Sequence, residues 1–249
     1  MERIAVLADI HGNLPALGVV VADIAHRGIT NVVNLGDHVS GPLWPAATLT
    51  FLMRQPWTHI AGNHDRHLVQ QDPAVHGASD RYAFAQLDQA QLAWLRALPA
   101  TSYLAPDILL CHGTPTNDEA YLLETIAQGG VRLATPQEIE QRLAGTQAAV
   151  ILCAHTHVPR VVHWNGQLIV NPGSVGSPAY MDETPEPHVV ATGSPMARYA
   201  VLEAHADGWR VELIALPYDH QQAAQQAQAN HRPEWAMALA TGFLERNIG

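Results

Sequence analysis

Short apolar runs and longer amphipathic stretches alternate along the first part of the chain. Residues 4–8, 31–35 and 57–61 are apolar runs that predict buried strands, whereas the spacing of apolar positions over 14–27 and 45–54 predicts helices. Strands that alternate with helices are typical of βαβ units. The pattern therefore predicts an α/β protein.

The alternation continues through the middle of the chain. A helix is expected over 88–98 and another over 135–144, where Thr135 can cap and Pro136 opens the first turn. Extended segments are expected over 101–104, 108–112 and 148–153. Shorter alternating segments then predict hairpins and a second sheet, with a tight turn at 164–167 and strands near 160–164, 167–171, 198–204 and 209–215.

Two later segments depart from this pattern. Residues 177–197, rich in Pro, Gly, Glu and Thr, predict a long exposed loop, with a lid as the alternative. The tail, 218–249, predicts two helices, the second begun by Pro233 and carrying an apolar stripe made of Trp235, Leu239, Phe243 and Leu244. We expect the stripe to pack back on the domain; a homodimer contact and a substrate cap are the alternatives.

Length and composition fit one compact domain. The 249 residues are 47% hydrophobic, which suffices for a large core, and neither a repeat nor a linker divides them. We expect a single domain over 1–249, with 218–249 as a C-terminal helical extension. Residues 17–24 come closest to a membrane span, but they are too few and Asp23 interrupts them, so no membrane attachment is expected.

Charge and cysteine content limit the binding partners and the cellular compartment that the sequence leads us to expect. A formal charge of −10 argues against binding long nucleic acids, which calls for a basic stripe. Met1-Glu2-Arg3 leads directly into a predicted strand, which favours a cytoplasmic location over a cleaved leader. Cys111 and Cys153 are too few for a disulfide framework. We expect them to be reduced core residues, with zinc ligation or a redox role as the alternatives.

Five short polar motifs come directly after apolar runs, in one order along the chain. They are Asp9-Ile10-His11, Gly36-Asp37, Gly62-Asn63-His64-Asp65, Cys111-His112-Gly113 and His155-Thr156-His157. Each contains an oxygen or imidazole ligand that divalent transition metals accept. Because side chains at i and i+2 of an extended segment point the same way, Asp9 and His11 should converge on one place, and so should His155 and His157.

The donor set of these motifs predicts a two-metal site. Asp37 adds a carboxylate able to bridge two cations, while Asn63 and His112 add an oxygen and a nitrogen. Mixed nitrogen and oxygen ligation suits manganese, iron, zinc or cobalt better than calcium or magnesium. Taken singly, each motif has a structural explanation, since the chain has fifteen histidines and Gly-Asp and Gly-Asn are common in turns. The prediction of a two-metal site rests on the presence of all five motifs in one chain and in one order.

The five motifs resemble those of the calcineurin-like metallophosphoesterase family, whose pattern is D-x-H, G-D, G-N-H-[DE], a lone His and G-H-x-H. The match spans residues 9 to 157. The resemblance implies an α/β fold in which two packed mixed β-sheets are flanked by helices, a four-layer sandwich with the ligands on loops at one edge. It also implies two divalent ions, manganese, iron or zinc, one held by Asp9, His11, Asp37 and His157 and the other by Asp37, Asn63, His112 and His155.

Details of the resemblance bear on the branch of the family. Ala154 stands where the family usually has glycine, an added methyl that we expect the backbone to tolerate. Residues 9–13 and 171–175 resemble the bacterial small-substrate branch. The protein phosphatase branch, with G-D-x-V-D-R-G, fits less well, because residues 36–42 lack its phosphate-gripping arginine. Arg66 and Arg160 are candidates to replace that arginine, or else solvated side chains.

The resemblance implies a hydrolase of small phosphate mono- or diesters, nucleotides among them. A hydroxide bridging the two cations would attack phosphorus in line, so no protein nucleophile is needed. Asp37 would be catalytic through both metals. His64, which is not a ligand, would stabilise the transferring phosphoryl group or protonate the leaving oxygen. Asp65 is expected either to orient His64 or to stabilise its turn.

Two other functions stay open at this point. The fold also serves as a non-enzymatic scaffold in the retromer subunit that shares it, and a protein phosphatase is the second alternative. Monoester or diester preference depends on the rim of the site rather than on the motifs. The rim residues expected from the sequence are His38, Trp44, His67, Asp118, Tyr121 and Tyr180.

Overall fold

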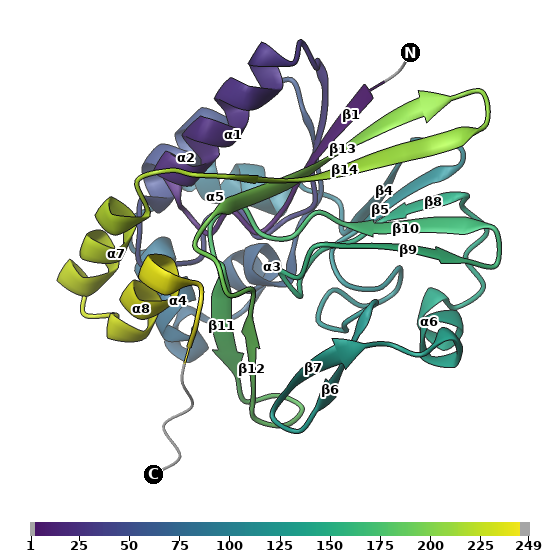
Figure 1. The fold of residues 1–249 in the computed structure, drawn as a ribbon. Helices are drawn as coiled ribbons and strands as arrows, with labels where there is room; N and C mark the ends of the chain where they lie inside the picture. Colours follow the sequence, from purple (N-terminus) through teal and green to yellow (C-terminus); the bar gives the residue numbers. More distant parts are fainter. Residues whose placement is uncertain (1–2, 245–249) are drawn as a thin grey trace.

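The first of two sheets, sheet A, is built around the N-terminal strand. The structure is a computed structural model that describes residues 3–244. Sheet A has the strand order β14–β13–β1–β2–β3, of which β14, β13 and β1 are labelled in Figure 1. The strands β1, β2 and β3 are parallel, and β13 is antiparallel to both of its neighbours. Their bounds are β1 Arg3–Leu7, β2 Asn31–Asn34, β3 Thr58–His59, β13 Ala197–His205 and β14 Gly208–Leu216.

Sheet B comes from the middle of the chain and has the order β4–β5–β8–β10–β9. Its three inner strands are parallel, and its two edge strands are antiparallel to them. The predicted tight turn joins β9 to β10, and both Asn165 and Gly166 adopt the positive φ that such a turn requires. The bounds are β4 Thr101–Ala105, β5 Ile108–Cys111, β8 Val150–Leu152, β9 Arg160–Trp164 and β10 Gln167–Asn171.

The two sheets pack face to face over the main core. Alternate residues of β1 point to opposite faces, so Ile4 and Val6 face sheet B while Leu7 faces α1 (Leu14–His26). On the far side, α6 (Pro136–Leu143) covers the outer face of sheet B. The resulting order of layers is helix, sheet, sheet, helix. The predicted fold class, two packed mixed sheets flanked by helices, is confirmed.

Four further helices pack around an apolar cluster of their own next to sheet A. They are α2 (Pro45–Leu52), α3 (Asn63–Gln70), α4 (Ala78–Phe84) and α5 (Gln89–Arg96). The sequence predicts α2 and α5 but neither α3 nor α4. In α3 only Leu68 and Val69 join the cluster, because much of the helix serves polar contacts.

Two short hairpins lie where the sequence analysis predicts no strands. They are β6–β7 (Glu124–Ala127 and Gly130–Leu133) and β11–β12 (Ala179–Asp182 and His188–Ala191). The prediction of one long loop over 177–197 is therefore wrong. The backbone N–H of Val189 donates to the carbonyl of Gly129 at 2.9 Å, which ties the two hairpins together.

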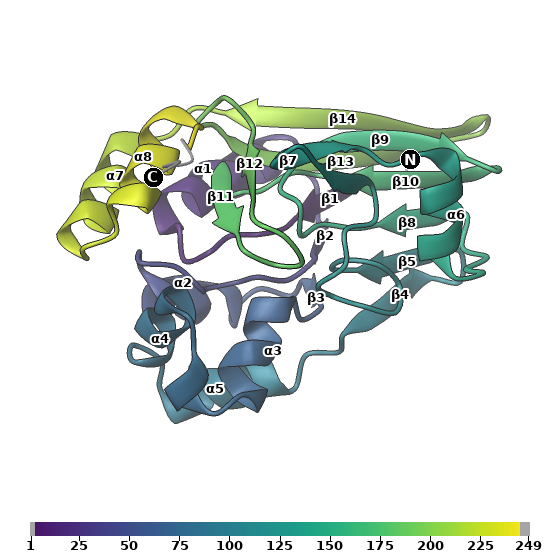
Figure 2. The same cartoon turned by 90° about the horizontal axis from the view of Figure 1, so that it is seen from below.

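The chain ends in two helices, α7 (His220–Ala229) and α8 (Pro233–Thr241), as predicted. Figure 2 shows α8 between α7 and the β11–β12 hairpin. Leu239 is buried with Leu43 in a small cluster, so this part of the stripe packs back on the protein. Phe243 lies beyond the end of α8 and is 56% exposed, so the stripe is shorter than predicted.

Residues 245–249 of the predicted extension lie outside the described residues. The single domain with an extension from 218, and a homodimer through these helices, stay predictions. Within residues 3–244 no helix has the length and apolar character needed to cross a bilayer.

Candidate metal centre

The five motifs meet at one edge of the two sheets. Strands β1, β2, β3 and β8 each end shortly before a motif and β5 ends on the first residue of one, and parallel strands carry the residues after them to the same edge. The structure gathers six of the predicted ligands in two groups. One is Asp9, His11 and His157, and the other is Asp37, His112 and His155.

The backbone presents these side chains from left-handed turns, not from extended strand. Asp9 has φ 53° and His11 φ 50°, and β1 has already ended at Leu7. Asp37, His155 and His157 also have positive φ. The predicted reason for convergence, alternation along an extended segment, is therefore wrong, and His155 and His157 point to different groups. Left-handed backbone is unfavourable for residues other than glycine and clusters at functional sites.

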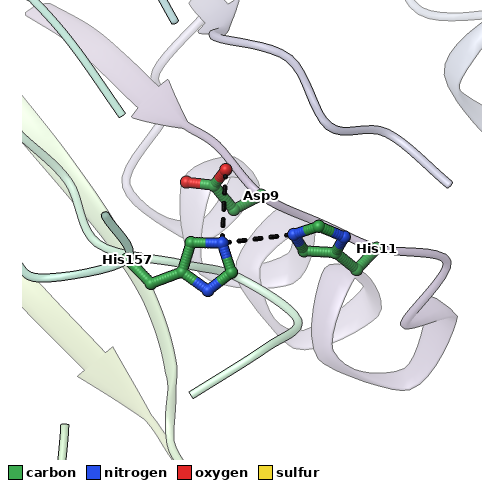
Figure 3. Close-up of side chains that lie close together, drawn as sticks. All are labelled: Asp9, His11 and His157. Atoms are coloured by element: carbon green, nitrogen blue, oxygen red, sulfur yellow. Dashed lines mark hydrogen bonds and ion pairs between the residues drawn. The ribbon is translucent and has the colours of Figure 1, made fainter. Parts of the chain in front are cut away.

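The first group directs two imidazole nitrogens at each other (Figure 3). The Nδ1–H of His11 donates to the carbonyl of Ser40 at 2.6 Å, and that of His157 to Ser177 at 2.7 Å. In the neutral imidazoles both Nε2 atoms then carry lone pairs, yet these atoms lie 3.2 Å apart. A cation between them would turn this repulsion into shared coordination, and an Nδ1–H fixed on a carbonyl is the usual second contact of a metal-binding histidine.

Asp9 completes the first group with a carboxylate that has no hydrogen-bond donor. Both of its oxygens are fully buried and make no hydrogen bond among the described residues. The nearest imidazole nitrogens are Nε2 of His157 at 3.5 Å and Nε2 of His112 at 3.9 Å from Oδ1. Buried carboxylates are normally hydrogen-bonded, so an unpartnered one at this position fits a cation.

The second group is arranged in the same way around His112. Its Nδ1–H donates to the carbonyl of Leu35 at 2.8 Å, and its Nε2 lies 3.0 Å from Oδ1 of Asn63 and 3.4 Å from Oδ2 of Asp37. The same Oδ2 is 3.8 Å from Nε2 of His11 in the first group. Asp37 therefore stands between the two groups, where a bridging ligand would be needed.

A glycine permits the close approach of Asp37 to the start of α3. A Cβ on Gly62 would lie 2.2 Å from Oδ1 of Asp37. That oxygen instead accepts a hydrogen bond from the backbone N–H of His64 at 3.0 Å. The glycine of the G-N-H-D motif is thus a steric requirement of the site.

Burial and charge act in opposite directions on the imidazoles. Burial lowers the pKa of His11 and of His155 to about 4, so both are neutral near pH 7, as ligands must be. Burial also acts to lower the pKa of His112, but the carboxylates of Asp37 and Asp9 outweigh it and raise the pKa to about 10. The donor set of carboxylates, imidazoles and one amide suits divalent transition metals.

His64 lies beside both groups without joining either. Its ring centroid is 5.7 Å from that of His11, and 33% of its side chain is exposed. Burial acts to lower its pKa, but the nearby carboxylates of Asp37 and Asp80 raise it to about 9. The prediction that His64 stands close to the site without being a ligand stays open.

Asp65 does not orient His64. Its carboxylate accepts hydrogen bonds from the backbone N–H groups of Gly62, Asp37 and His38, at 2.9, 2.8 and 3.1 Å. It also accepts one from Nδ1 of His38 at 2.7 Å. Of the two predicted roles, the structure supports the stabilisation of the turn. His38 is fully buried by this contact and is no rim residue.

The two arginines considered as phosphate ligands form ion pairs with other residues instead. Arg66 forms ion pairs with Asp118 at 2.7 Å and Glu119 at 2.9 Å, and Arg160 forms one with buried Glu124. Neither lines the cleft over the metal groups. Among residues 3–244, the arginines that do line it are Arg142 and Arg232, which belong to none of the sequence motifs.

The cleft has a volume of about 1260 Å³ and reaches from the two groups to the hairpins and α8. Among the predicted rim residues, His67, Tyr121 and Tyr180 line it, whereas His38, Trp44 and Asp118 do not. The Tyr121 ring lies 5.1 Å from that of His155, and the Tyr180 ring 4.7 Å from that of His157, so both rings pack on candidate ligands.

A third group, which the sequence analysis missed, contains His64, His67 and Asp80. Asp80 comes from α4 and belongs to none of the five motifs. No spacing along the chain could have indicated it, because its contact with His64 arises from the packing of α4 beside α3.

Comparison with known proteins agrees with this geometry. Residues 2–194 match the calcineurin-like phosphoesterase superfamily domain. The uncharacterized protein MJ0912 of Methanocaldococcus jannaschii is 23% identical over 250 residues, covering 94% of this chain and 95% of its own length.

Two solved structures share the fold along nearly the whole chain. A metallophosphoesterase from Sphaerobacter thermophilus has a TM-score of 0.75 at 23% identity and covers 97% of this chain and 99% of its own. The hypothetical protein PH1004 from Pyrococcus horikoshii OT3 has a TM-score of 0.75 at 21% identity, covering 98% and 100%. Because the family match spans well over half of the sequence, the chain belongs to the calcineurin-like phosphoesterase superfamily.

Proposed function

We propose that this protein is a binuclear metal-dependent phosphohydrolase that cleaves small phosphate mono- or diesters, nucleotides among them. The observation that carries the proposal is the buried Asp9 carboxylate, which has no hydrogen-bond donor among the described residues and lies 3.5 Å from Nε2 of His157, a residue that lines a large cleft. Superfamily membership supports phosphoester hydrolysis as the reaction.

The ligands would divide as the resemblance implies. Asp9, His11 and His157 would hold one divalent ion, and Asn63, His112 and His155 the other, with Asp37 shared. Manganese, iron and zinc are the ions that this donor set favours. When bound, two such cations supply an activated water as nucleophile and compensate the charge of the phosphate. The chain then has to orient the ester and stabilise its leaving oxygen.

His64 is the residue best placed for the leaving oxygen. It lines the cleft next to Asp37, and a third of its side chain is exposed there. A donor at this position can hydrogen-bond a phosphoryl oxygen or protonate the departing alkoxide.

The walls of the cleft favour small substrates. Glu119, Asp182, Glu183 and Glu186 line it, and these acidic groups would repel a long polyanion, whereas bound cations would attract a single phosphate. The segment at 36–42 has Ser40 and Gly41 where the protein phosphatase motif has Asp and Arg, which argues against that alternative. A cytoplasmic location stays a prediction.

The test begins with protein stripped of metal by a chelator. Hydrolysis of bis-p-nitrophenyl phosphate and of p-nitrophenyl phosphate is then followed with and without added manganese, and bound metal is measured in parallel. We expect manganese-dependent release of p-nitrophenol from at least one ester. The more reactive ester class indicates the substrate preference.

A matched variant controls for the effect of a substitution outside the cleft. Asp23→Asn changes a half-buried carboxylate of α1 that bonds Arg27 and Tyr199 away from the cleft, and this variant should keep full activity. If protein shown to contain two metal ions hydrolysed neither ester, that result would contradict the proposal and favour the non-enzymatic scaffold.

A further inference from the structure

Asp80 is the residue outside the sequence motifs that makes the closest contact with His64. Its Oδ1 lies 2.8 Å from Nδ1 of His64 and accepts a 2.5 Å hydrogen bond from the Ser40 hydroxyl. Asp80 is only 4% exposed. The Ser40 Oγ is itself 3.3 Å from the same Nδ1, so the three side chains form one compact contact.

This contact decides which nitrogen of His64 faces the substrate. An ionised carboxylate can only accept hydrogen bonds, so Nδ1 of His64 must be the donor to Asp80. The Nε2 atom is then the nitrogen left for the cleft, where a third of the side chain is exposed. Asp80 therefore fixes the direction of the ring, and in the protonated imidazole it leaves the N–H at Nε2 for the cleft.

The group is arranged as a hydrogen-bonded network and not as a third metal site. His64, His67 and Asp80 do place potential ligand atoms within 4.8 Å of one another. However, Nε2 of His67 lies 2.9 Å from Oε1 of Glu119, and its Nδ1 faces Oδ2 of Asp80 at 3.7 Å. Both ring nitrogens of His67 thus face carboxylates as donors would.

The metal groups differ from this network in what their nitrogens face. There the Nε2 lone pairs of His11 and His157 oppose each other at 3.2 Å. Within the described part of the chain, no such nitrogen–nitrogen contact at hydrogen-bonding distance joins His64 to His67. The third group satisfies its own charges, whereas the first group leaves this nitrogen pair and the Asp9 carboxylate without donors among the described residues.

The C-terminal helices hold both partners of His64 in place. Nδ2 of Asn230, just after α7, donates to the Pro42 carbonyl at 2.8 Å and to the Tyr82 hydroxyl at 2.8 Å. Pro42 lies two residues after Ser40, and Tyr82 two residues after Asp80. One amide therefore clamps the loop that carries Ser40 to the helix that carries Asp80.

A second contact joins the same elements. Nη1 of Arg232, at the start of α8, donates to the Ser79 hydroxyl at 3.2 Å, next to Asp80 in the chain. The α7–α8 hairpin, which comes long after every motif in the sequence, thus supports the edge of the sheets that carries His64.

We propose that Asp80 is the positioning residue of His64 and that Asn230 holds Asp80 and Ser40 in register for this task. The inference rests on the proposed phosphoesterase function. As the ester P–O bond breaks, its electron pair goes to the leaving oxygen and the proton on Nε2 of His64 passes to that oxygen. The imidazole ends neutral, with its Nδ1–H still held by Asp80.

The test uses leaving groups of different basicity. Manganese-loaded wild type and Asp80→Asn are compared on the two p-nitrophenyl esters and on their unsubstituted phenyl counterparts. A phenolate needs a proton to leave, whereas p-nitrophenolate leaves without one. We expect Asp80→Asn to lower kcat about 100-fold on the phenyl esters and less than about 5-fold on the nitrophenyl esters, with KM within about twofold.

A second variant leaves Asp80 itself intact. Asn230→Ala should lower kcat on the phenyl esters about 10-fold, again with little effect on the nitrophenyl esters, because a small displacement of a catalytic group is costly. Asp23→Asn serves as the control and should show no leaving-group dependence. Bound metal should be equal in all variants.

A readout independent of turnover is available in zinc-loaded protein with 15N-labelled histidine. The Nδ1 proton of His64, assigned by its loss in His64→Gln, should be a slowly exchanging downfield resonance in the wild type and should vanish in Asp80→Asn. If it persists in that variant, or if both ester classes slow equally, the positioning role is wrong.

Metal analysis separates the remaining explanations. Loss of a third equivalent of metal from Asp80→Asn would overturn the proposal in favour of a third cation. A wild type inert toward every ester would instead overturn the proposed function, and the positioning of His64 would then be decided by the Nδ1 resonance alone.

Discussion

The loop after β1 and the first turn of α3 each bury an aspartate at the same edge of sheet A, but the two carboxylates have opposite surroundings. Asp65 accepts hydrogen bonds from three backbone N–H groups and from Nδ1 of His38. Asp9 accepts none from the described residues and faces Nε2 of His157 at 3.5 Å. Both side chains have 0% exposure.

The difference distinguishes a carboxylate that stabilises the fold from one that is available to bind a ligand. Removing a carboxylate from water is costly unless donors or cations replace the water. Asp65 has such donors within the chain, so its charge is satisfied on folding. Of the described residues, Asp9 faces only the imidazole nitrogens of His157 and His112, at 3.5 and 3.9 Å, beyond hydrogen-bond distance or at its limit. Burial and residue type are the same; the partners decide the role.

Asp37 has one oxygen that accepts a backbone hydrogen bond and one that faces imidazoles. Its substitution should have the largest effect on kcat. Its Oδ1 accepts the His64 N–H at 3.0 Å, while its Oδ2 faces His112 and His11. We expect Asp37→Asn to lower kcat by about 1000-fold, because both proposed metals lose a shared anionic ligand and metal ions contribute several kcal/mol of charge stabilisation. The rate is measured on bis-p-nitrophenyl phosphate with bound metal determined in the same sample.

The bridging role has a clear counter-result. Near-normal turnover in Asp37→Asn with two metal ions retained would remove Asp37 from both metals. Asp23→Asn, which keeps the cleft untouched, controls for nonspecific loss.

The two buried aspartates themselves should respond differently in metal-free protein. Asp65→Asn should lower the free energy of unfolding by about 3 kcal/mol, because the new amide turns N–H groups toward donors that it cannot satisfy. Asp9→Asn should change it by less than about 1 kcal/mol, since no hydrogen bond is lost. Urea unfolding in the presence of a chelator measures both.

Added manganese should then distinguish the two variants in the opposite sense, through the stability gained on binding. It should stabilise the wild type and Asp65→Asn but have little effect on Asp9→Asn, because ligand binding stabilises only a protein that retains its site. Equal losses in the two metal-free variants would mean that Asp9, like Asp65, is a structural residue.

The fold was largely predictable because its central strands are covered on both faces. In β1 every residue from Ile4 to Leu7 is buried, so the apolar run is continuous and clear. The helix α3 was missed for the opposite reason. Its residues Asn63, His64 and His67 are directed to the site, so no apolar stripe marks it. The β11–β12 hairpin has strands too short to show an alternation.

The candidate ligands were predictable as a set, but the way they are presented was not. The motifs indicated which side chains converge, whereas the left-handed turns that aim Asp9 and His11 depend on distant backbone partners. The N–H of Asp9 donates to Gly36, and that of His11 to Asp37, each at 3.0 Å. Asp80 could not be found at all, since its role depends on the packing of α4 and not on any local pattern.

The smallest predicted effect concerns the protons that metal binding displaces. In metal-free protein His112 has a pKa of about 10, while His11 and His155 have pKa values of about 4. Near pH 7 only His112 of these three carries a proton that a metal must replace. Manganese affinity should therefore rise about tenfold per pH unit between about pH 6.5 and 8.5, with one proton released. Calorimetry in buffers of different ionisation enthalpy counts that proton.

In Asp65→Asn the proton release should persist, whereas replacing His112 with Gln should abolish it. A manganese affinity that does not depend on pH in the wild type would show that Asp9 and Asp37 do not hold the His112 imidazolium.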